Sequence, residues 1–182
     1  LYAACILILV GVGALDDKFD LSFKLRFIVQ AGLSVAMMMI GNIELKTIGD
    51  LGIKAVLLFV KVDDALKDNK GTEALNPEGL MQRAVRTVKA ITPDLVVMTD
   101  VALDPYSSHG HDGIVEEGKI LNDPTVEILS QMALSHAQAG ADFVAPSDMM
   151  DGRVFSIRNV LEEAGLTNTG IMSYSAKYSS SF

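Results

Sequence analysis

The pattern of hydrophobic and polar positions changes near residue 51. Before it, two uncharged and mostly apolar runs, residues 1–15 and 27–43, flank a short charged loop. After it, short apolar runs alternate with amphipathic ones, which is typical of β/α units around a parallel sheet. We therefore divide the chain into residues 1–51, interpreted as a truncated membrane helical hairpin, and residues 52–182, interpreted as the first half of a barrel domain.

The first segment resembles membrane helices in composition but not fully in length. Each run is slightly shorter than the roughly 20 residues that a spanning helix needs. The loop between them carries Lys18, Lys24 and Arg26, which the positive-inside rule places on the cytoplasmic side. The chain starts with neither a Met nor a basic region, which favours the cut end of a longer helix over a signal peptide. We expect membrane association through residues 1–43; the alternative is that this segment packs on the open sheet edge.

The second segment predicts four strands and three helices. Strands are expected at residues 54–60, 94–101, 142–146 and 170–175, with helices at 77–91, 124–139 and 153–164. Asn76 and Asp123 are predicted as helix N-caps, and Gly140 and Gly165 as C-caps. The predicted fold class is therefore α/β, a partial (β/α)₈ TIM barrel of about four strands preceded by two hydrophobic membrane-type helices.

Composition excludes several classes of function. Fifteen Lys and Arg against 23 Asp and Glu give a net charge of -8, which repels phosphate backbones and argues against a nucleic-acid partner. Cys5 is the only cysteine, so neither an internal disulfide framework nor a Cys-based zinc site can form. The expected compartment for the second segment is the reducing cytoplasm.

Candidate chemistry gathers where the predicted strands end, which is where α/β folds place their active sites. Asp100 and Asp104 follow the second strand and share one face by the period of two, whereas Ser147 follows the third. Lys177 follows the fourth, and a partly buried lysine has a lowered pKa that leaves its amine free to form a Schiff base with a carbonyl. The competing interpretation is a set of solvated surface residues.

Two motifs in the first segment resemble a membrane enzyme family. Residues 13–22 read GALDDKFDLS and residues 24–31 read KLRFIVQA, similar to undecaprenyl-phosphate N-acetylglucosamine-1-phosphate transferases. The resemblance implies that Asp16 and Asp17 belong to an active site that binds Mg²⁺, although spacing alone also fits a polar loop. The family's later acidic motifs are missing, so we expect no transferase activity; a transferase fragment is the alternative function.

Three longer motifs resemble porphobilinogen synthase, also called delta-aminolevulinic acid dehydratase. They are TDVALDPYSSHGHDG at residues 99–113, APSDMMDGR at 145–153 and IMSYSAKY at 171–178. The resemblance covers residues 52–182 and implies a TIM-barrel lyase of haem biosynthesis. Such an enzyme assembles as a homo-octamer and condenses two molecules of 5-aminolevulinate into porphobilinogen.

The same resemblance implies roles for individual residues. Lys177 matches the first of two lysines that form Schiff bases with substrate, and Asp100 and Ser147 match residues of the catalytic site. Tyr174, with Ser147, is expected to bind substrate. We keep these four assignments as predictions of the resemblance.

The metal site of the family differs in this sequence. Zinc-type members carry three cysteines where this chain has Ala102, Asp104 and Asp112. No zinc site is therefore expected, and the carboxylates of Asp104 and Asp112 favour Mg²⁺.

Departures from the family bear on activity. The second lysine and the lid of the family have no match, so we expect this polypeptide to be an inactive fragment when alone. The two resemblances join at Leu51–Gly52, which we interpret as an artificial or recombined junction in a chimera. A non-catalytic, misassembled product is a third interpretation.

Overall fold

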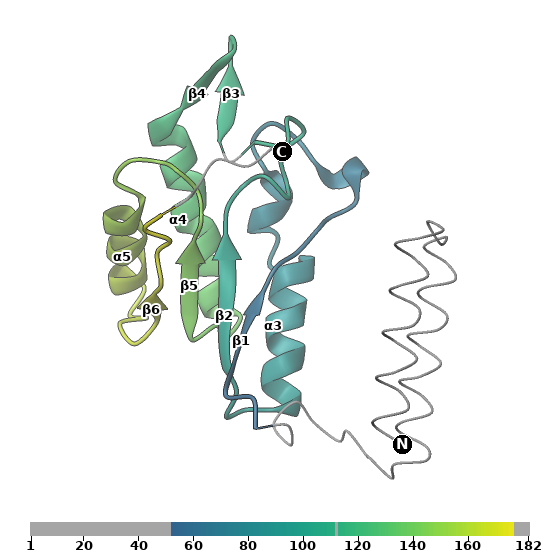
Figure 1. Cartoon of the computed structure of the whole chain (residues 1–182), viewed down its shortest axis with the longest axis vertical. Coiled ribbons are helices and arrows are strands. Elements are labelled where there is room, and N and C mark those ends of the chain that lie inside the picture. The colour runs from purple at the N-terminus through teal and green to yellow at the C-terminus, as the bar shows by residue number, and fades with distance from the viewer. Residues whose placement is uncertain (1–51, 112, 177–182) are drawn as a thin grey trace, which may run out of the picture. The chain divides into compact units, whose positions relative to one another are not determined.

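The computed structural model describes residues 52–111 and 113–176, which all belong to the second of two units along the chain (Figure 1). The two predicted membrane-type helices, together with Asp16 and Asp17, lie outside the described residues. Within the described ranges, no helix has the length and apolar character needed to cross a membrane.

A four-stranded parallel sheet forms the centre of this unit, in the order β1-β2-β5-β6. The strands are β1 (Ala55–Leu58), β2 (Val96–Val101), β5 (Phe143–Pro146) and β6 (Gly170–Ile171). Three helices connect them: α3 (Leu80–Ile91), α4 (Asn122–Gln138) and α5 (Arg153–Glu163). This is an α/β fold with a parallel sheet, consistent with part of a TIM barrel, and each predicted strand overlaps an observed one.

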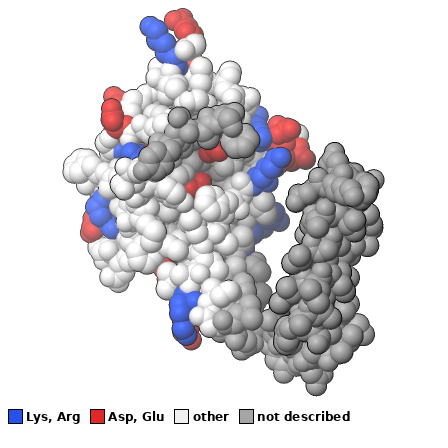
Figure 2. Space-filling view, viewed as in Figure 1, with Lys and Arg blue, Asp and Glu red and all other residues white. Residues whose placement is uncertain are grey.

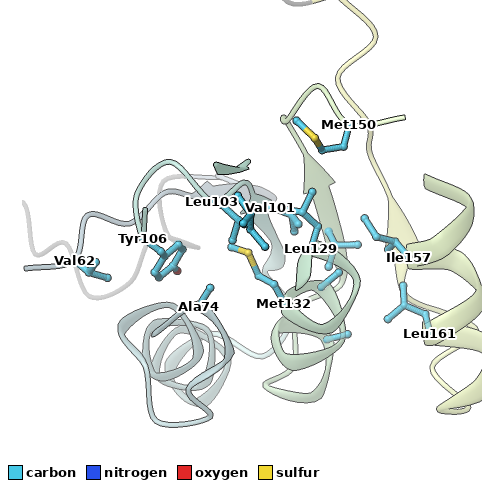
Figure 3. Packing of buried hydrophobic residues seen from close by; sticks show 14 residues of the cluster. Val62, Ala74, Val101, Leu103, Tyr106, Leu129, Met132, Met150, Ile157 and Leu161 are labelled. Atoms are coloured by element: carbon cyan, nitrogen blue, oxygen red, sulfur yellow. The ribbon is translucent and has the colours of Figure 1, made fainter. Parts of the chain in front are cut away.

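Apolar packing between the helices and one face of the sheet makes the core (Figure 3). Val101 on β2 and Leu129 on α4 are fully buried, and Ile157 and Leu161 of α5 complete this cluster. A second cluster joins α3 to the same face of the sheet. Burying one such side chain contributes about 1.5 to 3 kcal/mol, so this face determines how the helices pack.

The starts of α3 and α4 differ from the predicted ones, whereas the start of α5 and all three helix ends agree to within one residue. Helix α3 is capped by Gly79, because the Asn76 side chain instead accepts a hydrogen bond from the Glu78 amide (2.9 Å) in the turn before it. Helix α4 begins at Asn122, so the prediction of Asp123 as N-cap is wrong. The glycines predicted as C-caps, Gly140 and Gly165, directly follow the observed C-caps Ala139 and Ala164, and their φ of 108° and 75° lies in the left-handed range that favours glycine.

Two 3₁₀ turns and a hairpin were absent from the predicted set. The 3₁₀ turns η2 (Asp64–Leu66) and η3 (Thr72–Leu75) follow β1, and β3 (Ile114–Glu116) pairs with β4 (Lys119–Leu121) in an antiparallel hairpin. The hairpin extends beyond the end of the sheet at which β2 and β5 terminate (Figure 1).

The hairpin turn explains why the sequence pattern did not reveal it. Glu117 and Gly118 both have positive φ, 48° and 74°, as the tight turns of two-residue hairpins require. Glutamate is uncommon in that conformation, so the usual Asn-Gly or Asp-Gly signal is missing. Asn69 holds the hairpin from a distant loop: its amide nitrogen donates to the Val115 carbonyl (2.8 Å) and its oxygen accepts from the Val115 amide (3.1 Å).

A histidine is buried between helix and sheet. His136 lies on α4 with no exposed surface, and its Nδ1 is 3.1 Å from the Thr99 hydroxyl on β2. Burial lowers the pKa of His136 to about 3, so its imidazole is neutral at neutral pH.

This histidine makes stability depend on pH. In an unfolded chain the pKa of this histidine is near 6.5, so below about pH 6.5 the imidazole binds a proton in the unfolded state but stays neutral in the folded state. The free energy of unfolding therefore falls as the pH drops below about 6.5. We expect a loss of about 2 kcal/mol between about pH 7 and about pH 5 from this group. Urea denaturation across that interval should show a clearly shallower fall for His136→Gln than for the unchanged chain. The matched control is His109→Gln, at an exposed position; equal slopes for all three proteins would contradict the assignment.

Candidate active site

The register of β2 and β5 brings two predicted catalytic residues to one face of the sheet. Asp100 pairs with Ala145, and the Ser147 amide donates to the Val101 carbonyl (3.2 Å), which continues the parallel register past the end of β5. Side chains alternate along a strand, so Asp100, Ala145 and Ser147 share one face. Val101 belongs to the helix-facing core, so the shared face is the one opposite the helices.

The end of β6 adds the predicted substrate-binding residue to that face. Backbone pairing with β5 continues beyond Ile171, because the amides of Met172 and Tyr174 donate to the carbonyls of Val144 (2.9 Å) and Pro146 (3.1 Å). This register sets Tyr174 beside Ser147 and on the same face. Lys177 follows three residues later and lies outside the described residues.

These three residues differ in how far they are exposed. Asp100 is 7% exposed, Ser147 is half-buried and Tyr174 is 40% exposed. On the face shown in Figure 2, charged side chains lie mainly along the outline, and only a few acidic atoms are visible near the middle. A carboxylate that is as buried as that of Asp100 interacts more strongly with a nearby cation than a carboxylate in open water would.

Asp104 does not share the face of Asp100, contrary to expectation. Strand β2 ends at Val101, so the alternation with a period of two does not continue to Asp104, which lies exposed in the following turn. Asp112 lies outside the described residues. Across residues 52–111 and 113–176, no three potential metal-ligating side chains come together. These residues do not by themselves form a metal centre, and Mg²⁺ binding by Asp104 and Asp112 stays a prediction.

Sequence reasoning missed a buried tyrosine in the turn after β2. Tyr106 is 2% exposed and packs among Val62, Ala74 and Leu103 (Figure 3), and its hydroxyl has no hydrogen-bond partner among the described residues. Burial raises the pKa of the Tyr106 phenol, and the carboxylates of Asp100 and Glu73 raise it further. The phenol is therefore neutral. Its place inside a polar motif hid its role as a core residue.

A buried ion pair, also missed, joins the ends of β5 and β6. Asp148 is 3% exposed, and its Oδ2 lies 3.1 Å from Nε of Arg153, while its Oδ1 accepts from the Met150 amide (2.8 Å). Arg153 Nη1 donates to the Met150 carbonyl (3.0 Å), and Nη2 lies 3.5 Å from both the Ser173 hydroxyl and the Tyr174 carbonyl. The only sequence signal was an aspartate in the loop that precedes an arginine at a helix start.

A separate open hollow of about 430 Å³ lies among the loops that follow β1 and β2. Asp64, Lys67 and the 107–110 loop line it, and the Lys67 ammonium lies 2.7 Å from an Asp64 carboxylate oxygen. None of the residues predicted for catalysis lines this hollow.

The family model and the relatives that this chain matches all carry the same enzyme name. Residues 33–182 match the family model described as delta-aminolevulinic acid dehydratase. The chloroplastic enzyme of that name from Selaginella martensii is 60% identical over 134 residues, 73% of this chain and 32% of the relative. The Bradyrhizobium diazoefficiens enzyme is 52% identical over 132 residues, 72% of this chain and 37% of the relative. The chain thus spans about a third of the length of these relatives.

A solved structure shares the fold as well as the sequence. It is the delta-aminolevulinic acid dehydratase (porphobilinogen synthase) of Toxoplasma gondii in complex with the reaction product porphobilinogen. The likeness has a TM-score of 0.72 and 55% identity, covering 73% of this chain and 38% of that one.

The Tyr106 hydroxyl should contribute little to stability. Replacing Tyr106 by Phe removes a buried group that has no partner among the described residues, so we expect the free energy of unfolding to stay the same or to rise by up to about 1 kcal/mol. Tyr106→Ala should lower it by about 3 kcal/mol or more, because the ring leaves a cavity. Chemical denaturation measures both, with Tyr174→Phe as the control at an exposed position. A clear loss in Tyr106→Phe would show that the hydroxyl is hydrogen-bonded in solution.

Proposed function

The chain belongs to the delta-aminolevulinic acid dehydratase family, and from this premise we propose that it carries the first substrate site of a porphobilinogen synthase. The reaction condenses two molecules of 5-aminolevulinate into porphobilinogen, the first pyrrole of haem biosynthesis. The Toxoplasma relative, with porphobilinogen bound, supports this choice of ligand. The family match supports this function over the transferase alternative.

The observation that carries the proposal is the shared face at the strand ends. Asp100 lies on β2, Ser147 directly follows β5 and Tyr174 follows β6, and the backbone pairing supports a position for all three on one side of one end of the sheet. Lys177 follows Tyr174 by three residues. Active sites of parallel α/β folds form at this end.

The proposed chemistry begins at Lys177. Its neutral amine attacks the ketone carbon of 5-aminolevulinate, a carbon–nitrogen bond forms, and the carbonyl oxygen leaves as water, giving a Schiff base. Asp100 moves the protons that this dehydration requires and stabilises the positive charge of the protonated Schiff base, since its side chain is buried, where charges interact more strongly than in water. Ser147 and Tyr174 orient the substrate.

Metal, assembly and location stay predictions. Asp104 and Asp112 would hold Mg²⁺, which would supply charge neutralisation, and no step of the proposed chemistry passes through it. A homo-octamer is the assembly expected from the family. The cytoplasmic location expected for this part also stays a prediction, because several relatives are named as chloroplastic enzymes.

A separate function for residues 1–51 has less support than the function proposed for residues 52–182. The family match starts at residue 33, inside the hydrophobic run 27–43, and continues across Leu51–Gly52. The junction at Leu51–Gly52 and the chimera stay predictions. Nothing in the described residues supports membrane association.

Schiff-base formation should be detectable on this chain. Incubation with 5-aminolevulinate followed by borohydride reduction is expected to add a substrate-derived mass to Lys177, located by peptide mass spectrometry. Lys177→Met should lose that adduct, whereas Lys89→Met, at a lysine that pairs with Asp142, should retain it. The absence of an adduct on folded protein would refute the proposed site.

Asp100 should control the rate of trapping. Asp100→Asn removes the proton-transferring group, so we expect the adduct on Lys177 to form about a hundredfold more slowly. The rate is read from the adduct mass at successive quench times, and circular dichroism checks that the variant is folded. Asp151→Asn, at an exposed loop position beyond β5, is the matched control. An unchanged rate in Asp100→Asn would remove Asp100 from the mechanism.

A further inference from the structure

Two arginines of α5 contact opposite ends of the segment that contains β6. Arg158 donates to the carbonyls of Thr169 (2.8 Å) and Leu166 (3.2 Å), just before the strand. Arg153 lies 3.5 Å from the Tyr174 carbonyl, just after it. Helix α5 therefore contacts the backbone at both ends of β6. Of the two arginines, only Arg153 makes its contact at the end where the candidate site lies.

The Arg153 side chain is held in one position by groups of the loop after β5. Its Nε faces the Asp148 carboxylate, which has no exposed side-chain surface, and Nη1 donates to the Met150 carbonyl. A buried carboxylate requires a charged partner, and guanidinium offers a planar fork of donors that lysine cannot reproduce. With two nitrogens of the fork fixed, the third necessarily points at the end of β6.

The backbone of Tyr174 is consequently contacted on both sides. Its amide donates to the Pro146 carbonyl of β5, and its carbonyl faces Nη2 of Arg153. The same guanidinium nitrogen lies 3.5 Å from the Ser173 hydroxyl. These contacts hold the backbone of residues 173 and 174, which precede Lys177 in the sequence.

We propose that the Asp148–Arg153 pair is a positioning device for Lys177. Arg153 does not touch the substrate; it acts through the backbone of residues 173 and 174, so that the lysine amine meets the substrate carbonyl in a reactive orientation. This inference rests on the proposed function and adds to it a residue that sets the rate of Schiff-base formation. Misplacement of a reacting group by about 1 Å can cost about a hundredfold in rate.

The test compares Arg153 with Arg158 in the full chain. For Arg153→Met and Arg153→Lys, we expect the maximal rate of borohydride trapping on Lys177 to fall about tenfold or more, with little change in the 5-aminolevulinate concentration that gives half that rate. Asp148→Asn should act in the same direction, because a neutral amide no longer fixes the guanidinium. Arg158→Met should lower the thermal midpoint but keep the trapping rate within about threefold.

Two results would overturn the proposal. One is trapping at the unchanged rate in both Arg153 variants. The other is an equal loss of trapping in Arg153→Met and Arg158→Met, which would reduce the effect to stability alone.

Hydrogen exchange separates this inference from the proposed function. In Arg153→Met the backbone amides of residues 172–176 should exchange faster than in the unchanged chain, whereas in Arg158→Met the increase should fall on residues 166–170. If the unchanged chain forms no adduct, the proposed function fails, and the exchange pattern still decides whether Arg153 holds the strand end. Identical exchange at residues 172–176 in both variants would contradict that role.

Discussion

The parallel hydrogen-bond register of β2, β5 and β6 is the constraint on which the rest of this unit depends. It decides which residues face the helices and which face the other side. A shift of one residue in β2 would turn Val101 away from the core and place Asp100 among apolar helix side chains, at a large cost for burying a carboxylate there. The apolar packing of the helix-facing side therefore also protects the arrangement of the candidate site on the opposite side.

Polar groups are neutral on the helix side of the sheet and charged at the strand ends. On the helix side, His136 and Tyr106 are buried and stay neutral, because desolvation disfavours their charged forms. At the strand ends, the charged pair of Asp148 and Arg153 is retained, where each charge compensates the other and the guanidinium also reaches backbone carbonyls. Charge is thus kept where the chain turns between elements, which is where a parallel α/β fold places its chemistry.

Family membership and chain length bear on function in different ways. The match over residues 33–182 and the shared fold establish the family, whereas the chain spans about a third of the curated relatives. Four strands supply one set of strand ends, and the substrate site proposed there would account for only a part of the whole reaction. Of the two residues predicted to bind Mg²⁺, Asp104 lies in an exposed turn and Asp112 lies outside the described residues.

The sequence by itself determined the features that depend on neighbouring residues. Alternating apolar positions located the four strands, glycines located the C-caps of α4 and α5, and strand-end motifs located Asp100, Ser147 and Tyr174. Only the tertiary structure decided the β3–β4 hairpin, the separation of Asp104 from the face of Asp100, and the contacts of Arg153 with the end of β6. The reason is physical: periodicity and turn preference act over a few residues, whereas register, burial and ion pairing join segments that are far apart in the chain.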